Sequence, residues 1–322
     1  METALAHLDL RQVGFVLMKL KDAINGFTKW KAPQVKGNTI YHYHWQLVNF
    51  AMFLHNKDIE DVSEKDILEY LNLSQDFNHS ASTREKQALA IKHLLSYWQL
   101  KGLNVEKPEL VPKIRSERVM PRVATDSDYY KVLNVIPASG YNHIRNRAII
   151  ALLNDTGARL NEILGLNIQD IDLETKRITV RTEKHTKTAP FRNIFYREAT
   201  IVYLKTWLQK REEILEGLRI EDKDALFISV VGGACGEGTN ARRFSIDGAG
   251  EVLRKYSKMA GLKSVFNAHS LRHKLGRVLA ENEVDDLLIS QMLGHNSVDS
   301  SRIYTELFGP ALQKIYQKVM GK

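Results

Sequence analysis

Cysteine is almost absent from this chain of 322 residues, which contains only Cys235. An intramolecular disulfide needs two cysteines, so disulfide-stapled secreted folds are excluded and a reducing compartment is favoured. Cys235 lies in a glycine-rich run with no histidine or second cysteine at ligand spacing. The histidines His269, His273 and His295 lack carboxylates at coordinating spacing, so we expect no metal site.

Long hydrophobic runs and nucleotide-binding motifs are also missing. No apolar stretch approaches the length of a membrane span. The opening "METALAHLDLRQ" contains acidic residues and no apolar core of signal-peptide length, which predicts a cytoplasmic protein without a membrane partner. The run "VGGACGEG" lacks the Gly-Lys-Ser/Thr of a phosphate-binding loop, so we expect no nucleotide and no other cofactor.

Basic charge is what the chain has in excess. Lys and Arg total 46 against 38 Asp and Glu, which gives a net charge of +8 and an isoelectric point near 9.3. Two segments concentrate this charge: residues 28–38 hold three lysines and no acid, and residues 176–197 hold seven basic residues and one acid. Such an excess suits a polyanionic partner.

The chain is long enough for about two domains, and its hydrophobic content of 43% supports ordinary cores. Apolar spacing predicts four helices in the first third, which together form an all-α domain over residues 1–110. Ser63 is the predicted cap of the third helix, with Asp66 at the capping-box position. The expected helices cover residues 8–27, 39–55, 63–73 and 82–101.

Residues 111–125 are expected to be a linker, because the stretch 108–125 contains three prolines and mixed charge. A mostly helical second domain follows over residues 126–322. Within it, Ile178 and Val180 alternate with polar residues, and the alternation resumes after Lys184, which predicts a β-hairpin with a charged tip.

Three motifs in the second domain carry candidate chemistry. In "TGARLNEILGL", Arg159 lies between a glycine turn and a helix, where a structural ion-pair partner is the more typical role for a single arginine. In "AHSLRHKLG", His269 and Arg272 are three residues apart and so share a helical face that could clamp a phosphate. In "LGHNSVDSSRIYTEL", Tyr304 follows His295 by nine residues.

Together these motifs resemble the tyrosine recombinase (phage integrase) family in its Xer-like, two-domain form. The resemblance implies a mainly α fold with a small β-hairpin or sheet. A helical, SAM-like core-binding domain would precede a mixed α/β catalytic domain that ends in an exchange helix. It also implies a site-specific recombinase that cleaves and rejoins DNA through a 3′-phosphotyrosyl intermediate, for integration, excision or dimer resolution. A type IB topoisomerase-like strand transferase and an inactive DNA-binding relative are the alternatives.

The resemblance implies a role for each matching residue. Tyr304 would be the nucleophile, and Lys184 on the hairpin would protonate the leaving 5′ oxygen, with Lys187 as its rival. His269 would accept the tyrosine proton. Arg159 and Arg272 would hold the scissile phosphate, and His295 would hydrogen-bond one of its oxygens. Glu162 would support the site without reacting. The implied DNA partner is a duplex with a specific recombination site. Four copies of the chain would form a tetramer on two such duplexes, and the protein would be associated with the nucleoid.

These residue types suit the chemistry for physical reasons. Negative charge grows on the non-bridging oxygens of a phosphodiester under attack, and each fixed donor that meets it contributes on the order of 3 kcal/mol. Tyrosine has an ordinary pKa near 10, so it needs a base or cationic surroundings at neutral pH. A covalent phosphotyrosine keeps the energy of the broken bond, so rejoining needs no ATP.

Further basic residues are candidates for DNA contact outside the reacting centre. Four of them, all lysines, lie in the two segments that concentrate positive charge. The candidates are Lys29, Lys31, Lys36, Arg84, Lys187, Arg242 and Arg243.

This charge distribution predicts a steep salt dependence of DNA binding. If about six phosphates are neutralised, the logarithm of the association constant should fall with the logarithm of salt concentration at a slope of about −5. Fluorescence anisotropy of a labelled duplex at several salt concentrations measures the slope. A flat response would show that the basic segments do not face DNA.

Overall fold

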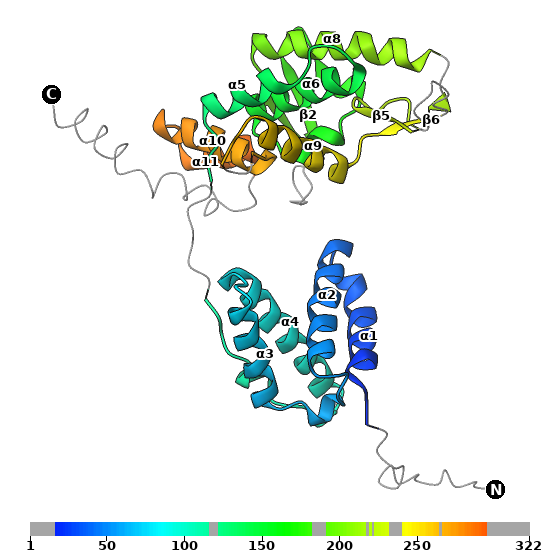
Figure 1. The fold of residues 1–322 in the computed structure, drawn as a ribbon, viewed down its shortest axis with the longest axis vertical. Coiled ribbons are helices and arrows are strands. Elements are labelled where there is room, and N and C mark those ends of the chain that lie inside the picture. The colour runs from blue at the N-terminus through cyan, green and yellow to red at the C-terminus, as the bar shows by residue number, and fades with distance from the viewer. Residues whose placement is uncertain are drawn as a thin grey trace, which may run out of the picture. The chain divides into compact units, whose positions relative to one another are not determined.

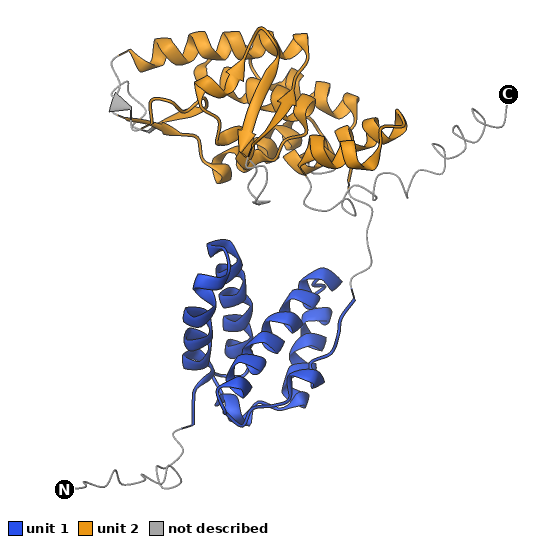
Figure 2. Ribbon diagram, turned by 180° about the vertical axis from the view of Figure 1, so that it is seen from behind, with its two compact units in different colours: residues 1–119 blue, residues 120–322 orange. Residues whose placement is uncertain are grey.

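The computed structural model describes residues 17–115, 122–181, 191–216, 219–220, 222–231, 240–263 and 266–294. The chain divides into two compact units, Met1–Val119 and Met120–Lys322, which Figure 2 colours separately. Helices dominate both units, and small sheets occur only in the described parts of the second (Figure 1). The expected mainly α fold with a small β component is confirmed.

The described part of the first unit is a cluster of four α-helices around one apolar core (Figure 1). Leu20, Phe27, Leu47 and Ile91 are among its fully buried side chains, and they come from three different helices. Three 3-10 turns, Ala32–Gln34, Ile59–Asp61 and Pro108–Leu110, connect or follow the α-helices. The helices are α1 (Leu20–Lys31), α2 (Gly37–Phe53), α3 (Glu64–Asp76) and α4 (Ala81–Leu100).

Local sequence signals locate these helices well, with one exception. Ser63 caps α3, and its hydroxyl and the Asp66 carboxylate form the predicted capping box. The first helix begins at Leu20 rather than near residue 8 and continues to Lys31. Within the expected span, residues 17–19 are not helical and residues 8–16 lie outside the described residues. Lys19 instead forms a β-bridge with Asp58, which fixes where α1 can start.

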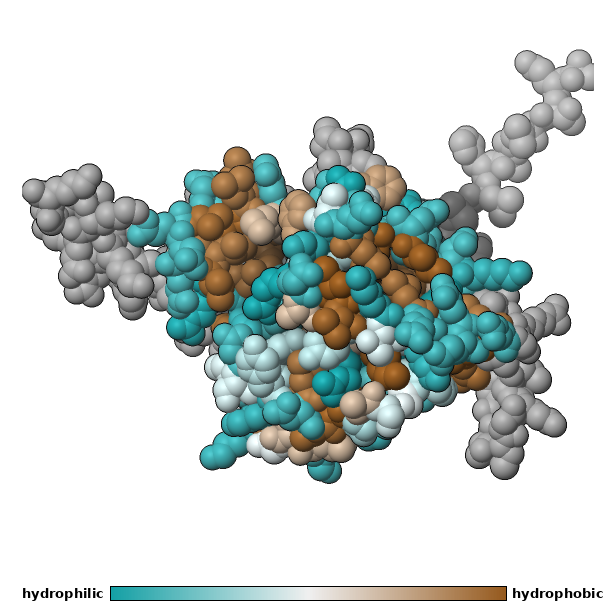
Figure 3. All heavy atoms as spheres, turned by 90° about the horizontal axis from the view of Figure 1, so that it is seen from above, coloured by the Kyte–Doolittle hydropathy of each residue, from teal (hydrophilic) through white to brown (hydrophobic). Residues whose placement is uncertain are grey.

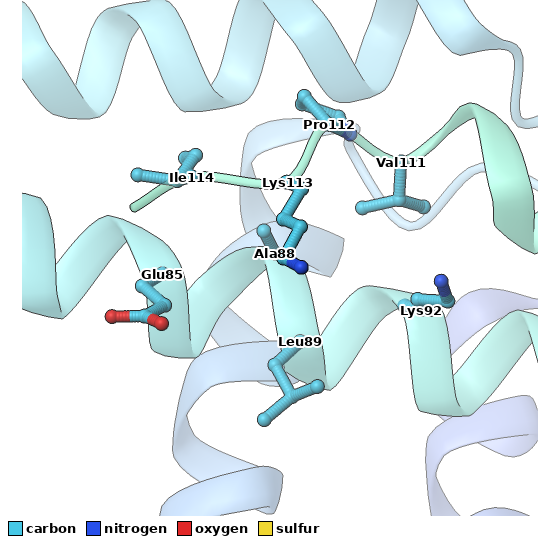
Figure 4. Close-up of a pocket in the computed structure, with 8 residues that line it drawn as sticks. All are labelled: Glu85, Ala88, Leu89, Lys92, Val111, Pro112, Lys113 and Ile114. Atoms are coloured by element: carbon cyan, nitrogen blue, oxygen red, sulfur yellow. The ribbon is translucent and has the colours of Figure 1, made fainter. Parts of the chain in front are cut away.

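The chain after α4 folds back along that helix. Figure 4 shows Val111, Pro112, Lys113 and Ile114 lining a pocket together with side chains of α4. Val111 is buried, and Ile114 packs on the core of the first unit. The beginning of the expected linker is therefore attached to the first unit.

The second unit is built around α6, whose residues from Ala148 to Asn154 are all buried. A helix that is apolar on nearly every side belongs in the middle of a core, and α6 contacts α5, α7, α8, α10 and β3. Gly157 ends α6 in the left-handed conformation. The helices are α5 (Asp126–Val135), α6 (Tyr141–Thr156), α7 (Leu160–Leu164), α8 (Glu198–Leu215), α9 (Ile246–Met259), α10 (Ala268–Glu281) and α11 (Asp286–Leu293), with a 3-10 turn at Ile168–Asp170.

Two three-stranded sheets complete the second unit. In the first, β1 (Ile171–Asp172), β2 (Arg177–Arg181) and β3 (Phe191–Phe195) run antiparallel in that order, which confirms the predicted hairpin strands. The hairpin tip lies outside the described residues. The second sheet was not predicted, because strands this short lack a clear alternation of apolar and polar residues. In it, β6 lies between β4 and β5. Its strands are β4 (Arg219–Ile220), β5 (Ile228–Val231) and β6 (Asn240–Arg243).

Hydrophobic residues are part of the surface, as is usual for a folded protein. On the face that Figure 3 presents, patches of hydrophobic residues lie between hydrophilic ones. On α11, Leu287, Leu288 and Met292 are exposed. In the described parts of the chain, no helix combines the length and the apolar character that crossing a membrane requires.

One buried carboxylate joins α6 to the start of α8. The Asp155 side chain is 1% exposed and accepts hydrogen bonds from the backbone N–H of Arg197 at 2.9 Å and from the Thr200 hydroxyl at 2.7 Å. The guanidinium of Arg197 also donates to Asp155, through Nε at 2.9 Å. Asp155 therefore caps α8 from a neighbouring helix and fixes how α8 packs on α6.

Replacing Asp155 by Ala should loosen the start of α8. The lost cap and hydrogen bonds are worth about 2 kcal/mol, or about 30-fold in the exchange rate of the protected amides. Hydrogen exchange followed by mass spectrometry on peptides covering α8 measures the change. Glu251→Ala, on the exposed face of α9, is the matched control and should shift exchange little. Equal exchange in both variants would contradict the capping role.

Candidate active site

Arg159 lies in the short connection between α6 and α7. Gly157 makes this connection possible, because it has a φ of +55° and a Cβ at that position would come within 2.9 Å of Leu275 Cδ2. Arg159 is the N-cap residue of α7, and Glu162 stands at the third position of that helix. The glutamate Oε2 accepts the backbone N–H of Arg159 at 2.8 Å. The motif "TGAR" thus presents the Arg159 side chain at a fixed point.

Glu162 is the centre of a cluster of charges. Its side chain is fully buried, while those of Arg159 and Arg192 are 21% and 11% exposed. Arg192 donates to both carboxylate oxygens at 2.7 Å, and Arg159 Nη1 donates to Oε1 at 3.1 Å. Burial alone would raise the pKa of Glu162, but the hydrogen bonds and charge of Arg192, helped by Arg159, hold it below its ordinary value.

Arg192 is the site residue that the sequence motifs did not single out. It lies on β3 opposite Val180, two residues before the buried Ile194. Side chains two apart on a strand share a face, so Arg192 points to the buried side of the sheet. An arginine at a core-facing position of an alternating strand was the signal that could have identified it.

Arg272 comes from α10, which begins with a capping box between Asn267 and Ser270. Arg272 is 4% exposed, which is unusual for an arginine. Its Nη1 donates to the carbonyl of Gly157 at 3.0 Å, and its Nη2 donates to the carbonyl of Leu293. It therefore ties the Arg159 connection to the end of α11.

Three arginines converge on the last carbonyls of α11. Arg192 Nε donates to Met292 O at 3.4 Å, Arg272 to Leu293 O, and Arg159 Nη2 to Gly294 O at 2.8 Å. A helix leaves its final carbonyls without partners and carries partial negative charge there, so cations suit this end.

Gly294, the glycine of "LGH", is required where the three arginines meet the end of α11, for two reasons. Its φ is +67°, a conformation that other residues rarely adopt. A Cβ at this position would lie 2.6 Å from Arg192 Nη1.

His269 and His273 lie on the same face of α10, one turn apart. His269 is exposed, yet the surrounding protein lowers its pKa by desolvation and the charges of Arg272 and Arg159 lower it further. His273 is half-buried, and desolvation, with His269 and Arg272 nearby, lowers its pKa to about 4. Both imidazoles are therefore neutral at pH 7, and His269 can accept a proton.

Four of the seven sequence-predicted centre residues fall in the described part of the chain. The structure brings Arg159 and Arg272 to the end of α11, with Glu162 bonded to Arg159. His269 lies close enough to both arginines for their charges to lower its pKa. The other three, Lys184, His295 and Tyr304, lie outside the described residues, as does Lys187, the rival of Lys184. Within the described residues, no group of three or more His, Cys, Asp or Glu could hold a metal ion.

The DNA-contact candidates differ in how the structure uses them. Lys29, Lys36 and Arg242 have exposed positions. Lys31 lies over the Trp30 ring, 5.2 Å from its centroid, and Arg84 donates to Gln75 at 2.6 Å.

Arg243 is bound into the protein through all three guanidinium nitrogens. These nitrogens donate to Asp222, to Asn167 and to the carbonyls of Leu164 and Leu166. This arginine holds the turn after α7 against β6.

Sequence comparison places the chain among recombinases. The chain is 29% identical over 231 residues to the tyrosine recombinase XerA of Pyrococcus furiosus, covering 71% of this chain and 72% of the relative. It is 23% identical over 286 residues to the tyrosine recombinase XerD of Oceanobacillus iheyensis, covering 87% and 91%.

Solved structures share the fold. The XerH site-specific recombinase bound to a palindromic difH substrate superposes with a TM-score of 0.70 at 20% identity, covering 94% of this chain and 97% of that one. A lambda integrase tetramer bound to a Holliday junction superposes with a TM-score of 0.65 at 20% identity, covering 89% of this chain and 78% of that one.

The family model described as the phage integrase family matches residues 124–309, which is more than half of the chain. The chain therefore belongs to the phage integrase family and is a relative of the Xer tyrosine recombinases.

Proposed function

We propose that this enzyme breaks and rejoins DNA at a specific site through Tyr304. The tyrosine oxygen attacks the scissile phosphorus, the bond to the 5′ oxygen breaks, and a 3′-phosphotyrosyl linkage forms. The observation that carries the proposal is the meeting of Arg159 and Arg272 at the last carbonyls of α11. Tyr304 follows Gly294 by ten residues, so the chain between them can reach at most about 35 Å from the carbonyl that Arg159 binds.

The two arginines are suited to hold the scissile phosphate. They come from separate elements, and their positions are fixed by Glu162 and by main-chain carbonyls rather than by flexible contacts. Fixed donors stabilise the charge that develops on the phosphate oxygens without reorganising during the reaction. A phosphate carries full charge and would outcompete the carbonyls as an acceptor.

His269 is the proposed acceptor of the Tyr304 proton. Its pKa is lowered, so the imidazole is neutral at pH 7 and can act as a base. Lys184 is proposed to protonate the leaving 5′ oxygen, with Lys187 as the alternative, and His295 to donate to the phosphate. These assignments rest on the family's motif positions.

The proposed partner is a DNA duplex carrying a recombination site, bound in the cytoplasm by a tetramer on two duplexes. The solved neighbours include a recombinase bound to its DNA substrate and an integrase tetramer on a Holliday junction, both with the same fold.

Residues 1–110 are proposed to be the core-binding domain, 111–125 the linker and 126–322 the catalytic domain. The tail after Tyr304 is proposed to act as the exchange helix between subunits. Lys29, Lys36 and Arg242 are the exposed DNA-contact candidates that the structure leaves most accessible.

Replacing Tyr304 by Phe should abolish the covalent adduct while DNA binding is preserved, because only the nucleophilic oxygen is removed. The substrate is a nicked duplex carrying the site recovered by selection from random-sequence DNA, and the adduct is measured on a denaturing gel. Tyr316→Phe is the control and should form the adduct. If Tyr304→Phe still formed the adduct and Tyr316→Phe did not, Tyr316 would be the nucleophile instead.

Replacing Gly294 by Ala should slow cleavage by about tenfold or more, because the added Cβ displaces Arg192 and, with it, the arginine cluster. Gly261→Ala is the matched control: Gly261 has a φ of +64° but open space around its Cβ position. Both variants should lose about 1–2 kcal/mol of stability from backbone strain. Only the Gly294 variant should cleave slowly on the same nicked duplex, and equal rates would refute the steric argument.

A further inference from the structure

Arg192 and Arg159 share one carboxylate, but they do not share it equally. Arg192 makes the paired contact, with one nitrogen on each oxygen of Glu162 at 2.7 Å. The side chain of Arg159 reaches only Oε1, at the longer distance of 3.1 Å. Its other terminal nitrogen turns away to the Gly294 carbonyl.

The charges of this cluster do not cancel. One carboxylate faces two guanidinium groups, so the three side chains carry a net charge of +1. The remaining partners of the arginines at α11 are carbonyls, which are dipoles without net charge. The cluster therefore keeps one positive charge in excess.

Without Arg192 the balance would change. A buried carboxylate must be paired, and the strongest pairing with arginine is the two-pronged contact that Arg192 now makes. Among the described residues, Arg159 is the other cation that forms an ion pair with Glu162. It would rotate into the vacated contact, and the two remaining side chains would form a neutral pair turned away from a substrate.

We propose that Arg192 is a positioning residue of this recombinase: by occupying both oxygens of Glu162, it keeps the guanidinium of Arg159 out of a two-pronged pair with that carboxylate and directed toward the scissile phosphate. This inference rests on the proposed function, in which Arg159 binds that phosphate. Arg192 itself has no contact with the reacting atoms in this scheme and acts only through Arg159.

The first test is the cleavage rate of Arg192→Gln on the nicked duplex, measured as covalent adduct formed with time. The rate should fall by about 10- to 100-fold, the usual effect of removing a residue that orients a reacting group. Arg254→Gln is the matched control, because Arg254 is an exposed arginine of the same unit whose Nε donates only to its own helix. It should cleave at the wild-type rate.

The decisive test combines this change with Glu162→Gln. In the double variant no carboxylate remains to capture Arg159, so cleavage should be about tenfold faster than in Arg192→Gln alone. A residue that only supported packing would give the opposite result, because two buried changes would impair the fold more than one. A double variant as slow as the single variant, or slower, overturns the proposal.

Lysine at position 192 provides a second arm if Arg192→Gln does not fold, as judged by circular dichroism. Arg192→Lys keeps the positive charge beside Glu162 but loses the two-pronged geometry, so its rate should lie between wild type and Arg192→Gln. Adding Glu162→Gln to Arg192→Lys should not accelerate cleavage, because the lysine already balances the carboxylate. Acceleration there would contradict the charge argument.

The wild-type chain separates this inference from the proposed function. If wild type forms no adduct with any selected site, the proposed function fails. If wild type forms the adduct and Arg192→Gln matches Arg254→Gln, only the role of Arg192 fails.

Discussion

The burial of the Glu162 carboxylate is the constraint on which the site depends. A charge that is fully removed from water is tolerated only when cations and hydrogen bonds surround it. Here the cations are Arg159 and Arg192, and the backbone N–H of Arg159 supplies a further bond. One side chain thus fixes the start of α7, the direction of Arg159 and the position of β3 beside them.

The end of α11 is the second half of the same arrangement. Its last carbonyls need donors, and the arginines need acceptors while no phosphate is present. Carbonyls satisfy the guanidinium groups without neutralising them, so the positive charge persists. Arg272 shows the same logic: it is buried, and it donates to the main-chain carbonyls of Gly157 and Leu293. The segment that leads to Tyr304 starts from this anchored point.

Much of the fold was predictable from local signals. The capping box at Ser63, the buried alternation of Ile178 and Val180, and the glycine turn before α7 each placed an element near its observed bounds. The start of α1 was predicted too early, because a bridge to Asp58, far along the chain, sets it. The second sheet was missed because its strands are short and one of them, β4, pairs with the distant β6.

The sequence by itself determined the helical character of both units, the hairpin and the motif positions of Arg159, Glu162, His269 and Arg272. The helices and the hairpin follow from caps, turns and apolar spacing, which act over a few residues, and the four site residues were indicated by the resemblance of their motifs to the family. Only the tertiary structure decided which charges meet. Arg192 lies 30 residues from Glu162, and Arg159 lies 135 residues from Gly294. No local pattern encodes such distances, because packing of α6, β3, α10 and α11 into one core brings these groups together.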